Sequence, residues 1–210
     1  MRLYEFGPTR ALRARWTLQE LGVEFEAVSV NLLAGEHLTP EFLRLNPVAK
    51  LPVLVDGDQV LTESAAIVLY LAEKYPEGRL LPASVAERAQ AYRWLLFTVT
   101  ELEQPLWRMA RHKFLYPEQK RSQEDIQLAR EDIRPMLEVI DRHMQGRSYV
   151  VGDSVTVTDF VLAYTLDWAD IEALLEDFPV LEQYMQSMYR RPKATMRIAA
   201  ASAAAGTDQG

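Results

Sequence analysis

The stretch Asn46–Ser64, which reads NPVAKLPVLVDGDQVLTES, decides the fold. It holds two short apolar runs, Leu51–Val55 and Gln59–Leu61. The Asp56-Gly57-Asp58 sequence between them is typical of a turn that joins antiparallel strands. Pro52 lies where the first run begins, and a proline belongs at a strand start or a bend because it cannot donate to a sheet ladder. The stretch therefore predicts a β-hairpin that is entered through a proline corner.

The two ends of this stretch also predict a binding site. A cis Leu51–Pro52 bond would form a fixed corner that holds open the backbone of Leu51. Ser64 is a suitable N-cap for a following helix whose apolar face includes Ile67 and Leu71. A helix N-terminus carries unpaired N–H groups and a partial positive charge, so it favours a carboxylate. The corner and the helix start together suit a short, extended, anionic peptide.

The motif N-P-x-x-K-L-P-V-L, followed by the D-G-D turn and T-E-S-x-A-I, resembles the glutathione-binding core of the soluble glutathione transferases. The resemblance is strongest over residues 1–82 and extends to residues 1–200. It implies that the backbone of Leu51, before Pro52, pairs with the cysteinyl part of glutathione. It also implies that Glu63 pairs with the α-ammonium and Ser64 with the α-carboxylate. A surface glutamate and a plain helix cap are the simpler interpretations of these two residues. One departure is Ala49, where the family often has glycine.

Two further residues are candidates for the glycine carboxylate of glutathione. The segment resembles the phi-type plant transferases, in which positions such as His37 and Lys50 grip that carboxylate. Lys50 directly precedes Leu51, so the proline corner fixes its neighbour. His37 follows Gly35-Glu36 in an expected loop, and a solvent-exposed histidine is an equally good interpretation.

The reactive group in this family is the glutathione thiol. A free thiol has a pKa of about 8.5, and lowering it by about two units requires roughly 2.7 kcal/mol. One hydrogen bond to the sulfur anion supplies about 1.5–3 kcal/mol, so a single hydroxyl at a helix start suffices. Thr9 is that hydroxyl. A gap-free comparison with the bacterial beta-type transferases places Arg10 at the position of their catalytic cysteine, so Arg10 is a second candidate. Tyr4 is a third candidate, although an aromatic residue in the middle of a strand more often belongs to the core.

Arg10, Arg13 and Arg15 crowd the first turns of the expected first helix, where cations oppose the helix dipole. We interpret Arg13 and Arg15 as a solvated face. For Arg10, a contribution of positive potential to an anion site is an equally good interpretation.

Composition excludes several classes of protein. The 210 residues carry a net charge of −7, which argues against nucleic acid or an anionic membrane as the main partner. There are no cysteines, so disulfide reduction through a protein thiol is excluded. No run of about 18 apolar residues predicts a membrane span. The three histidines are far apart and predict no metal site. We expect a cytoplasmic protein.

The order of elements predicts two domains. From the N-terminus we expect a strand, a helix, a strand, a short helix, the hairpin and a further helix, which is the thioredoxin-like α/β pattern. The first of these helices is expected to start at Thr9 or Arg10. We place this domain at 1–76, a linker at 77–83 and an all-helical domain with an electrophile pocket at 84–210. The helices expected in the second domain are Ser84–His112 with a kink at Pro105, Glu118–Gln145, one capped by Thr156 and Asp159, 179–190 and 193–204.

The resemblance implies a glutathione transferase that stabilises the glutathione thiolate and adds it to a hydrophobic electrophile. It also implies a homodimer. Two alternatives remain open at this stage. One is a binding or regulatory protein that keeps the fold without turnover, and the other is a glutathione-dependent isomerase or dehalogenase.

Overall fold

The computed structural model describes residues 1–207 and divides the chain into two compact units. The first unit comprises Met1–Leu81 and the C-terminal segment from Tyr189 onward, and the second comprises Pro82–Met188. No helix among the described residues is both long and apolar enough to cross a membrane.

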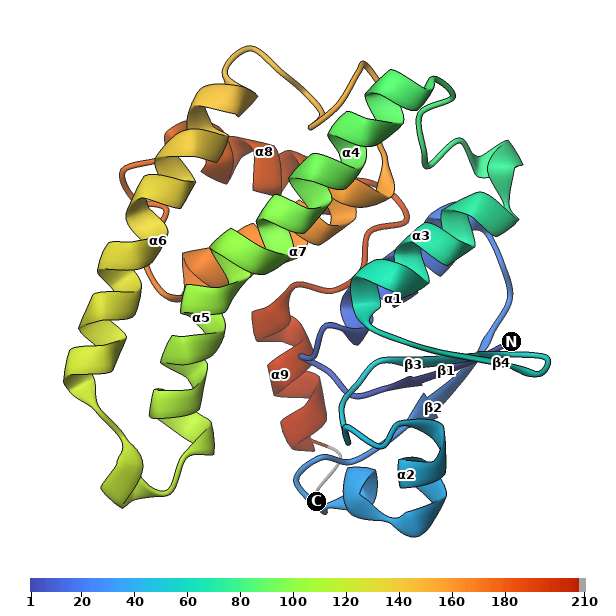
Figure 1. The fold of residues 1–210 in the computed structure, drawn as a ribbon, viewed down its shortest axis with the longest axis vertical. Coiled ribbons are helices and arrows are strands. Elements are labelled where there is room, and N and C mark those ends of the chain that lie inside the picture. The colour runs from blue at the N-terminus through green and yellow to red at the C-terminus, as the bar shows by residue number, and fades with distance from the viewer. Residues whose placement is uncertain (208–210) are drawn as a thin grey trace. The chain divides into compact units, whose positions relative to one another are not determined.

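The first unit is built on a four-stranded sheet in the order β2-β1-β3-β4 (Figure 1). Strand β1 is parallel to β2 and antiparallel to β3, and β3 and β4 form the predicted antiparallel hairpin. The thioredoxin-like order predicted from the sequence is therefore confirmed. The elements are β1 (Arg2–Glu5), α1 (Ala11–Leu21), β2 (Glu26–Ser29), η1 (Glu36–Leu38), α2 (Pro40–Leu45), β3 (Val53–Asp56), β4 (Gln59–Thr62), α3 (Ser64–Lys74) and η2 (Pro76–Gly78).

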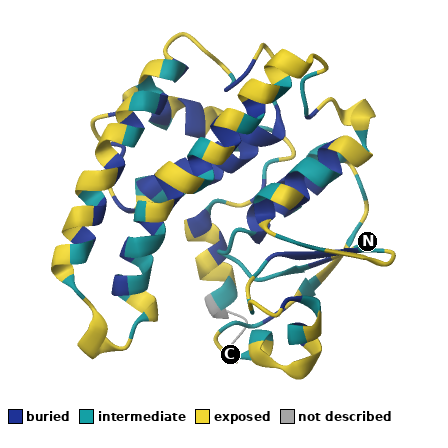
Figure 2. Ribbon diagram, in the orientation of Figure 1, coloured by how far each residue is buried: buried dark blue, intermediate teal, exposed yellow. Residues whose placement is uncertain are grey.

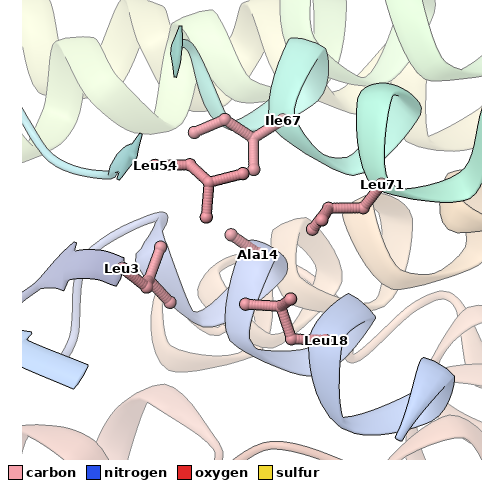
Figure 3. Packing of buried hydrophobic residues seen from close by; sticks show 6 residues of the cluster. All are labelled: Leu3, Ala14, Leu18, Leu54, Ile67 and Leu71. Atoms are coloured by element: carbon pink, nitrogen blue, oxygen red, sulfur yellow. The ribbon is translucent and has the colours of Figure 1, made fainter. Parts of the chain in front are cut away.

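The alternation of side chains along the strands creates two apolar layers. On one face of the sheet, Leu3 and Leu54 are fully buried against α1 and α3, as Figure 3 shows. The α1 and α3 residues in this cluster are Ala14, Leu18, Ile67 and Leu71. A second cluster combines Val30, Phe42, Val53 and Val55, with Tyr4 and Leu51 packed against it. Successive residues such as Leu3 and Tyr4 therefore serve different cores.

The start of α3 differs from the prediction. We expected Ser64 to cap this helix, but Glu63 is the N-cap residue and Ser64 is the first helical residue. The Ser64 hydroxyl makes no capping bond because it is buried and accepts a hydrogen bond from Arg13 instead. The helix α1 ends at Gly22, which adopts the left-handed conformation with φ = 67° that favours glycine.

The C-terminal segment is attached to α1 by charged and aromatic contacts. Arg191 donates to both carboxylate oxygens of Glu20, at 2.7 and 3.0 Å, and the Lys193 ammonium donates to the Glu20 carbonyl. The rings of Trp16 and Tyr189 lie 4.9 Å apart. The helix predicted over 193–204 begins later, as α9 (Ile198–Thr207), because these contacts hold the preceding residues in a non-helical conformation. Residues 208–210 lie outside the described part.

The second unit is helical, as predicted, and its buried residues gather on α7 (Figure 2). Its elements are α4 (Val85–Phe97), η3 (Thr98–Leu102), α5 (Glu103–Ala110), η4 (Arg111–Leu115), η5 (Glu118–Lys120), α6 (Gln123–Met144), α7 (Val157–Ile171) and α8 (Pro179–Tyr189), whose last residue is assigned to the first unit.

Two predicted helices have different bounds in the structure. The helix expected over Ser84–His112 is interrupted by η3 and η4, which are π-helical segments on either side of α5. Pro105 lacks an N–H group and cannot bond the carbonyl four residues earlier, which favours the wider π turn before it. The helix expected from Glu118 begins at Gln123, because the Ser122 hydroxyl accepts the Asp125 N–H and caps it there.

The predicted capping box at the start of α7 is confirmed. The Asp159 carboxylate accepts hydrogen bonds from the Thr156 N–H at 2.8 Å and the Thr156 hydroxyl at 2.9 Å. It also accepts from the Val150 N–H and the Tyr184 hydroxyl, both at 2.8 Å. Burial raises the pKa of Asp159, although these hydrogen bonds act to lower it. The box thus joins α7, α8 and the loop between α6 and α7.

The Glu20–Arg191 pair predicts a pH-dependent stability. Burial alone would raise the pKa of Glu20, but the hydrogen bonds and charge of Arg191 outweigh it and the pKa is lowered. A lowered carboxyl pKa stabilises the fold above the unfolded-state pKa, about 4.3, and the contribution is lost as pH falls through the folded-state pKa. We expect Arg191→Gln to reduce the free energy of unfolding by about 1–2 kcal/mol at neutral pH, with the deficit shrinking below about pH 4.

Urea unfolding followed by circular dichroism at both pH values measures this deficit. Arg190→Gln is the matched control, because Arg190 is the exposed neighbour. A deficit that does not change with pH, or an equal one in the control, would contradict the assignment.

Candidate functional site

The proline corner is held in shape by Asn46, which is buried. Its side-chain amide donates to the Lys50 carbonyl at 2.8 Å, and its side-chain oxygen accepts the Val48 N–H at 3.1 Å. Between them, Ala49 has φ = 56°, a left-handed conformation that favours glycine. The predicted cis Leu51–Pro52 bond is present. These local bonds explain why the NPVAKLP sequence forms a loop rather than extending the strand.

The corner leaves one peptide backbone available to a ligand. Among residues 1–207, no hydrogen bond involves the N–H or carbonyl of Leu51, whose side chain packs on the second apolar cluster. The hairpin register pairs Val53 with Thr62, so the residues just outside the ladder, Pro52 and Glu63, are neighbours. The structure therefore brings Leu51 and Pro52 beside the start of α3.

The start of α3 is open for an anion. The first helical hydrogen bond runs from the Ile67 N–H to the Glu63 carbonyl, so the N–H groups of residues 64–66 have no partner in the described chain. Glu63 is exposed, has φ = 67°, and its carboxylate has neither a hydrogen bond nor an ion pair within residues 1–207. Such backbone strain in a non-glycine residue clusters at functional sites.

Arg13, on α1, contacts the start of α3. Its side chain is fully buried, and Nη1 donates to the Ser64 hydroxyl oxygen at 3.2 Å. A guanidinium has donors only, so the Ser64 oxygen must accept and its own proton is left for another acceptor. Our interpretation of Arg13 as a solvated residue was wrong, because the face of α1 that carries it is covered. Arg15, by contrast, is partly exposed and ion-paired with Glu5.

The start of α1 is less open than the start of α3. The Thr9 hydroxyl donates to the Phe6 carbonyl at 2.5 Å, and its oxygen accepts from the Ala11 N–H at 3.4 Å. The Thr9 proton is therefore used within the loop, and the hydroxyl must rotate before it can donate elsewhere. Arg10 is the N-cap residue of α1 and makes no capping bond through its side chain. Gly7, just before this turn, faces Ala201 of α9, whose Cβ would lie 3.2 Å from an added Cβ.

Three other predicted site residues occupy different parts of the first unit. Tyr4 packs edge-on against Phe42 at 6.3 Å, in the cluster that α1 does not join. His37 lies in η1, and its buried Nδ1 has no hydrogen-bond partner in the described part of the chain. Lys50 is exposed and directly precedes the corner. Within residues 1–207, no three His, Cys, Asp or Glu side chains are grouped as a metal site would require.

The first unit is therefore a thioredoxin-like domain with a cis-proline corner beside an open helix start, and an all-helical unit follows it in the chain. Comparison with known families then identifies the family. The N-terminal domain of glutathione S-transferases matches residues 1–73, and the C-terminal domain of the same family matches residues 103–192. The chain belongs to the glutathione S-transferase family, which confirms the resemblance read from the sequence.

Individual relatives agree with this assignment. Glutathione S-transferase 1 of Dianthus caryophyllus is 40% identical over 78% of this chain and 74% of its own length. Among solved structures, the ternary complex of BphK, a bacterial glutathione transferase, is 28% identical with a TM-score of 0.82, covering 98% of this chain and 100% of the other. The transferase URE2P6 from Phanerochaete chrysosporium, solved with oxidized glutathione, is 25% identical with a TM-score of 0.83, covering 98% and 96%.

Proposed function

We propose that this protein is a glutathione transferase that binds glutathione between the proline corner and the start of α3. The observation that carries the proposal is the row of unpartnered N–H groups at residues 64–66 beside a Ser64 hydroxyl whose oxygen is already occupied by Arg13. This arrangement is complementary to a carboxylate, because the helix N-terminus, the hydroxyl proton and a buried cation all favour negative charge.

The tripeptide fits this site in one direction. Its γ-glutamyl α-carboxylate takes the start of α3 and the Ser64 hydroxyl, and its α-ammonium pairs with the exposed Glu63 carboxylate. Its cysteinyl backbone pairs with the open N–H and carbonyl of Leu51, beside Pro52. Lys50, next in the chain, then meets the glycine carboxylate, with the His37 ring as a second hydrogen-bonding group on that side. Each of these groups supplies a charge opposite to that of its partner or a complementary hydrogen bond.

Catalysis then requires ionisation of the bound thiol and an electrophile close to it. We assign the thiolate-stabilising hydrogen bond to Thr9 after rotation of its hydroxyl, with Arg10 contributing positive potential at the start of α1. The thiolate forms a bond to the electrophilic carbon of a hydrophobic substrate, and the leaving group departs or a proton completes the addition. Holding both reactants in contact supplies much of the rate enhancement.

Glutathione binding tests the site. We expect Ser64→Ala to raise the Kd for glutathione by about tenfold or more, because a hydrogen bond to a charged group contributes about 1.5–3 kcal/mol. Arg13→Gln acts in the same direction by releasing the Ser64 hydroxyl. Isothermal titration calorimetry measures both.

Arg15→Gln is the matched control, since Arg15 lies on the same helix and pairs with Glu5 instead. The proposed site is wrong if Ser64→Ala, folded by circular dichroism, binds glutathione as tightly as the wild type.

The thiolate assignment has its own test. Thr9→Ala removes the hydroxyl, and we expect the pKa of bound glutathione to rise by about one to two units, the equivalent of one charge-assisted hydrogen bond. Thr9→Ser keeps the hydroxyl and is expected to keep the low pKa. The ultraviolet absorbance of the thiolate, titrated with pH, reports the value directly. An unchanged pKa in Thr9→Ala would assign the stabilisation to Arg10 and the α1 backbone.

Glutathione-dependent disulfide exchange is a second candidate, favoured by the oxidized glutathione bound to the Phanerochaete relative. The bound thiolate would attack one sulfur of a disulfide, forming a mixed disulfide while the other sulfur leaves as a thiolate and takes a proton. A second glutathione thiolate would then attack the glutathione sulfur of the mixed disulfide, which forms oxidized glutathione and releases the other sulfur as a thiolate that takes a proton. No protein cysteine is needed, which agrees with a chain that has none.

Steady-state turnover of a dialkyl disulfide and of an aryl halide distinguishes the two reactions. We expect conjugation of the aryl halide to be lost in Ser64→Ala at low glutathione and restored at high glutathione. Turnover of the disulfide alone would favour exchange as the principal activity. Binding of glutathione without turnover of either substrate would favour a non-catalytic binding protein. The homodimer, the cytoplasmic location and the isomerase or dehalogenase alternative stay predictions.

A further inference from the structure

The loop between α6 and α7, residues 145–156, encloses a cavity that the proposed reaction does not use. In Figure 1 this loop runs along the top of the helical unit. The cavity has a volume of about 450 Å³, within the range of roughly 300–1,000 Å³ for ligand pockets. Its lining includes Gln145, Arg147, Ser148, Tyr149 and Asp153. We refer to it as the α6–α7 loop cavity.

Arg147 is a cation of this cavity that has no counter-ion. The residue is exposed, and its guanidinium makes neither a hydrogen bond nor an ion pair within residues 1–207. Its backbone N–H bonds the Met144 carbonyl at 3.0 Å, so the end of α6 fixes the point at which the side chain leaves the loop. A guanidinium presents five donors in a planar fork that matches the oxygens of a phosphate or a carboxylate. Arg147 is therefore available to an anionic ligand.

The dipole of α6 accounts for a neighbouring arginine but not for Arg147. Cations in the last turn of a helix are favoured by the partial negative charge of its C-terminus. Arg142 is such a residue, because its Nε donates to the Glu138 carbonyl at 3.3 Å. The Arg147 side chain bonds no carbonyl within residues 1–207 and lies beyond the last helical residue, Met144. The end of the helix therefore does not explain its charge.

Two further cations lie near Arg147. The His143 ring stacks on the Trp94 ring of α4 at 4.1 Å, and the Arg93 guanidinium lies over the same Trp94 ring at 4.6 Å. Burial of the His143 ring lowers its pKa, and the charges of Arg147 and Arg93 lower it further, whereas its hydrogen bond to a loop carbonyl acts to raise it. Neither arginine has a carboxylate partner within residues 1–207. The potential beside the cavity is therefore positive, although the chain as a whole is acidic.

The backbone of the loop adds hydrogen-bond donors. Val150 anchors the loop, because its N–H donates to Asp159 at 2.8 Å and its carbonyl accepts from the His143 ring at 2.7 Å. The N–H groups of Ser148 and Tyr149, by contrast, have no partner in the described chain, and their hydroxyls make no hydrogen bond there. A phosphate monoester carries three strong acceptor oxygens. It can therefore use the guanidinium and these donors together, which a carboxylate with two oxygens does less completely.

The rest of the lining suits hydroxyl groups. Asp153 is exposed, and its carboxylate has no partner within residues 1–207. The Gln145 side chain donates to Asp141 at 3.0 Å, which leaves its carbonyl oxygen free to accept. Both groups accept hydrogen bonds from hydroxyls, and the half-buried Tyr149 ring offers an apolar face to C–H groups. A ligand that satisfies both parts of the lining is a polyol that carries one phosphate.

We propose that the α6–α7 loop cavity binds a sugar phosphate, with the phosphate on Arg147 and the loop N–H groups and the hydroxyls on Asp153 and Gln145. The site lies wholly within the helical unit and uses no residue of the glutathione site. It therefore goes beyond the proposed function and stands or falls separately from it.

Calorimetry with the full chain tests this site, with glucose 6-phosphate as the probe and inorganic phosphate and glucose as its two halves. We expect glucose 6-phosphate to bind at least about tenfold more tightly than either half, because charge-assisted and neutral hydrogen bonds combine. Arg147→Gln is expected to weaken glucose 6-phosphate and inorganic phosphate by about tenfold. Asp153→Asn is expected to weaken glucose 6-phosphate alone. Arg142→Gln is the matched control and is expected to change neither, because Arg142 lies outside the lining.

The His143 ring provides a second measurement that a merely structural role of Arg147 does not move. A bound phosphate places negative charge beside the arginines that lower the pKa of His143, so saturating glucose 6-phosphate is expected to raise that pKa. In Arg147→Gln the added ligand is expected to leave the pKa of His143 where it is. Nuclear magnetic resonance of the ring, assigned with His143→Gln, follows the titration in both proteins.

Equal affinity for glucose 6-phosphate in Arg147→Gln and in the wild type would overturn the proposal, provided that circular dichroism shows both to be folded. Binding that leaves the His143 titration unchanged would place the ligand elsewhere and would also overturn it. Glutathione affinity, measured for each variant in the same way, is expected to stay at the wild-type value. Failure of this site is thereby distinguished from failure of the proposed function.

Discussion

The hydrogen bond from the buried Arg13 guanidinium to Ser64 is the interaction on which the binding site depends. It joins α1 to the first residue of α3, two helices that pack on the same face of the sheet. The Arg13 side chain is fully buried, so its position against Ser64 is set by the packing of α1 rather than by solvent. The bond fixes which way the Ser64 proton points, and it adds positive potential at the place where N–H groups have no partner.

The remaining geometry follows from the hairpin register. Because Val53 pairs with Thr62, the proline corner at one end of β3 and the strained Glu63 at the end of β4 must be neighbours. Asn46 holds the loop before the corner by bonding the Lys50 carbonyl. The unpaired backbone of Leu51 and the unpaired N–H groups at the start of α3 therefore lie close together, just beyond the last pair of the β3–β4 hairpin. A peptide ligand could contact both. The sheet sets this spacing, and flexible side chains contribute little to it.

Sequence reasoning succeeded where the structure is determined locally. The hairpin around Gly57, the cis bond before Pro52 and the capping box of Thr156 and Asp159 each depend on residues within a few positions of one another. It failed where contacts between segments distant in the sequence determine the structure. The burial of Arg13 depends on which segments cover one face of α1. The spacing of residues within α1 does not predict this burial. The prediction that Ser64 is the N-cap of α3 was wrong for the same reason, since Arg13, 51 residues away, donates to its hydroxyl. The late start of α9 depends on contacts with Glu20.

The attachment of the last segment to α1 makes the first unit discontinuous in sequence. Arg191 bonds Glu20, and Ala201 lies against Gly7, at the opposite end of the chain. Domains generally fold as units, in order of synthesis. Here the thioredoxin-like unit lacks its last helix until the whole helical unit has been translated. A nascent chain therefore has the residues of the proposed glutathione site early but acquires the helix beside the α1 turn only at the end, which couples completion of the first unit to completion of the chain.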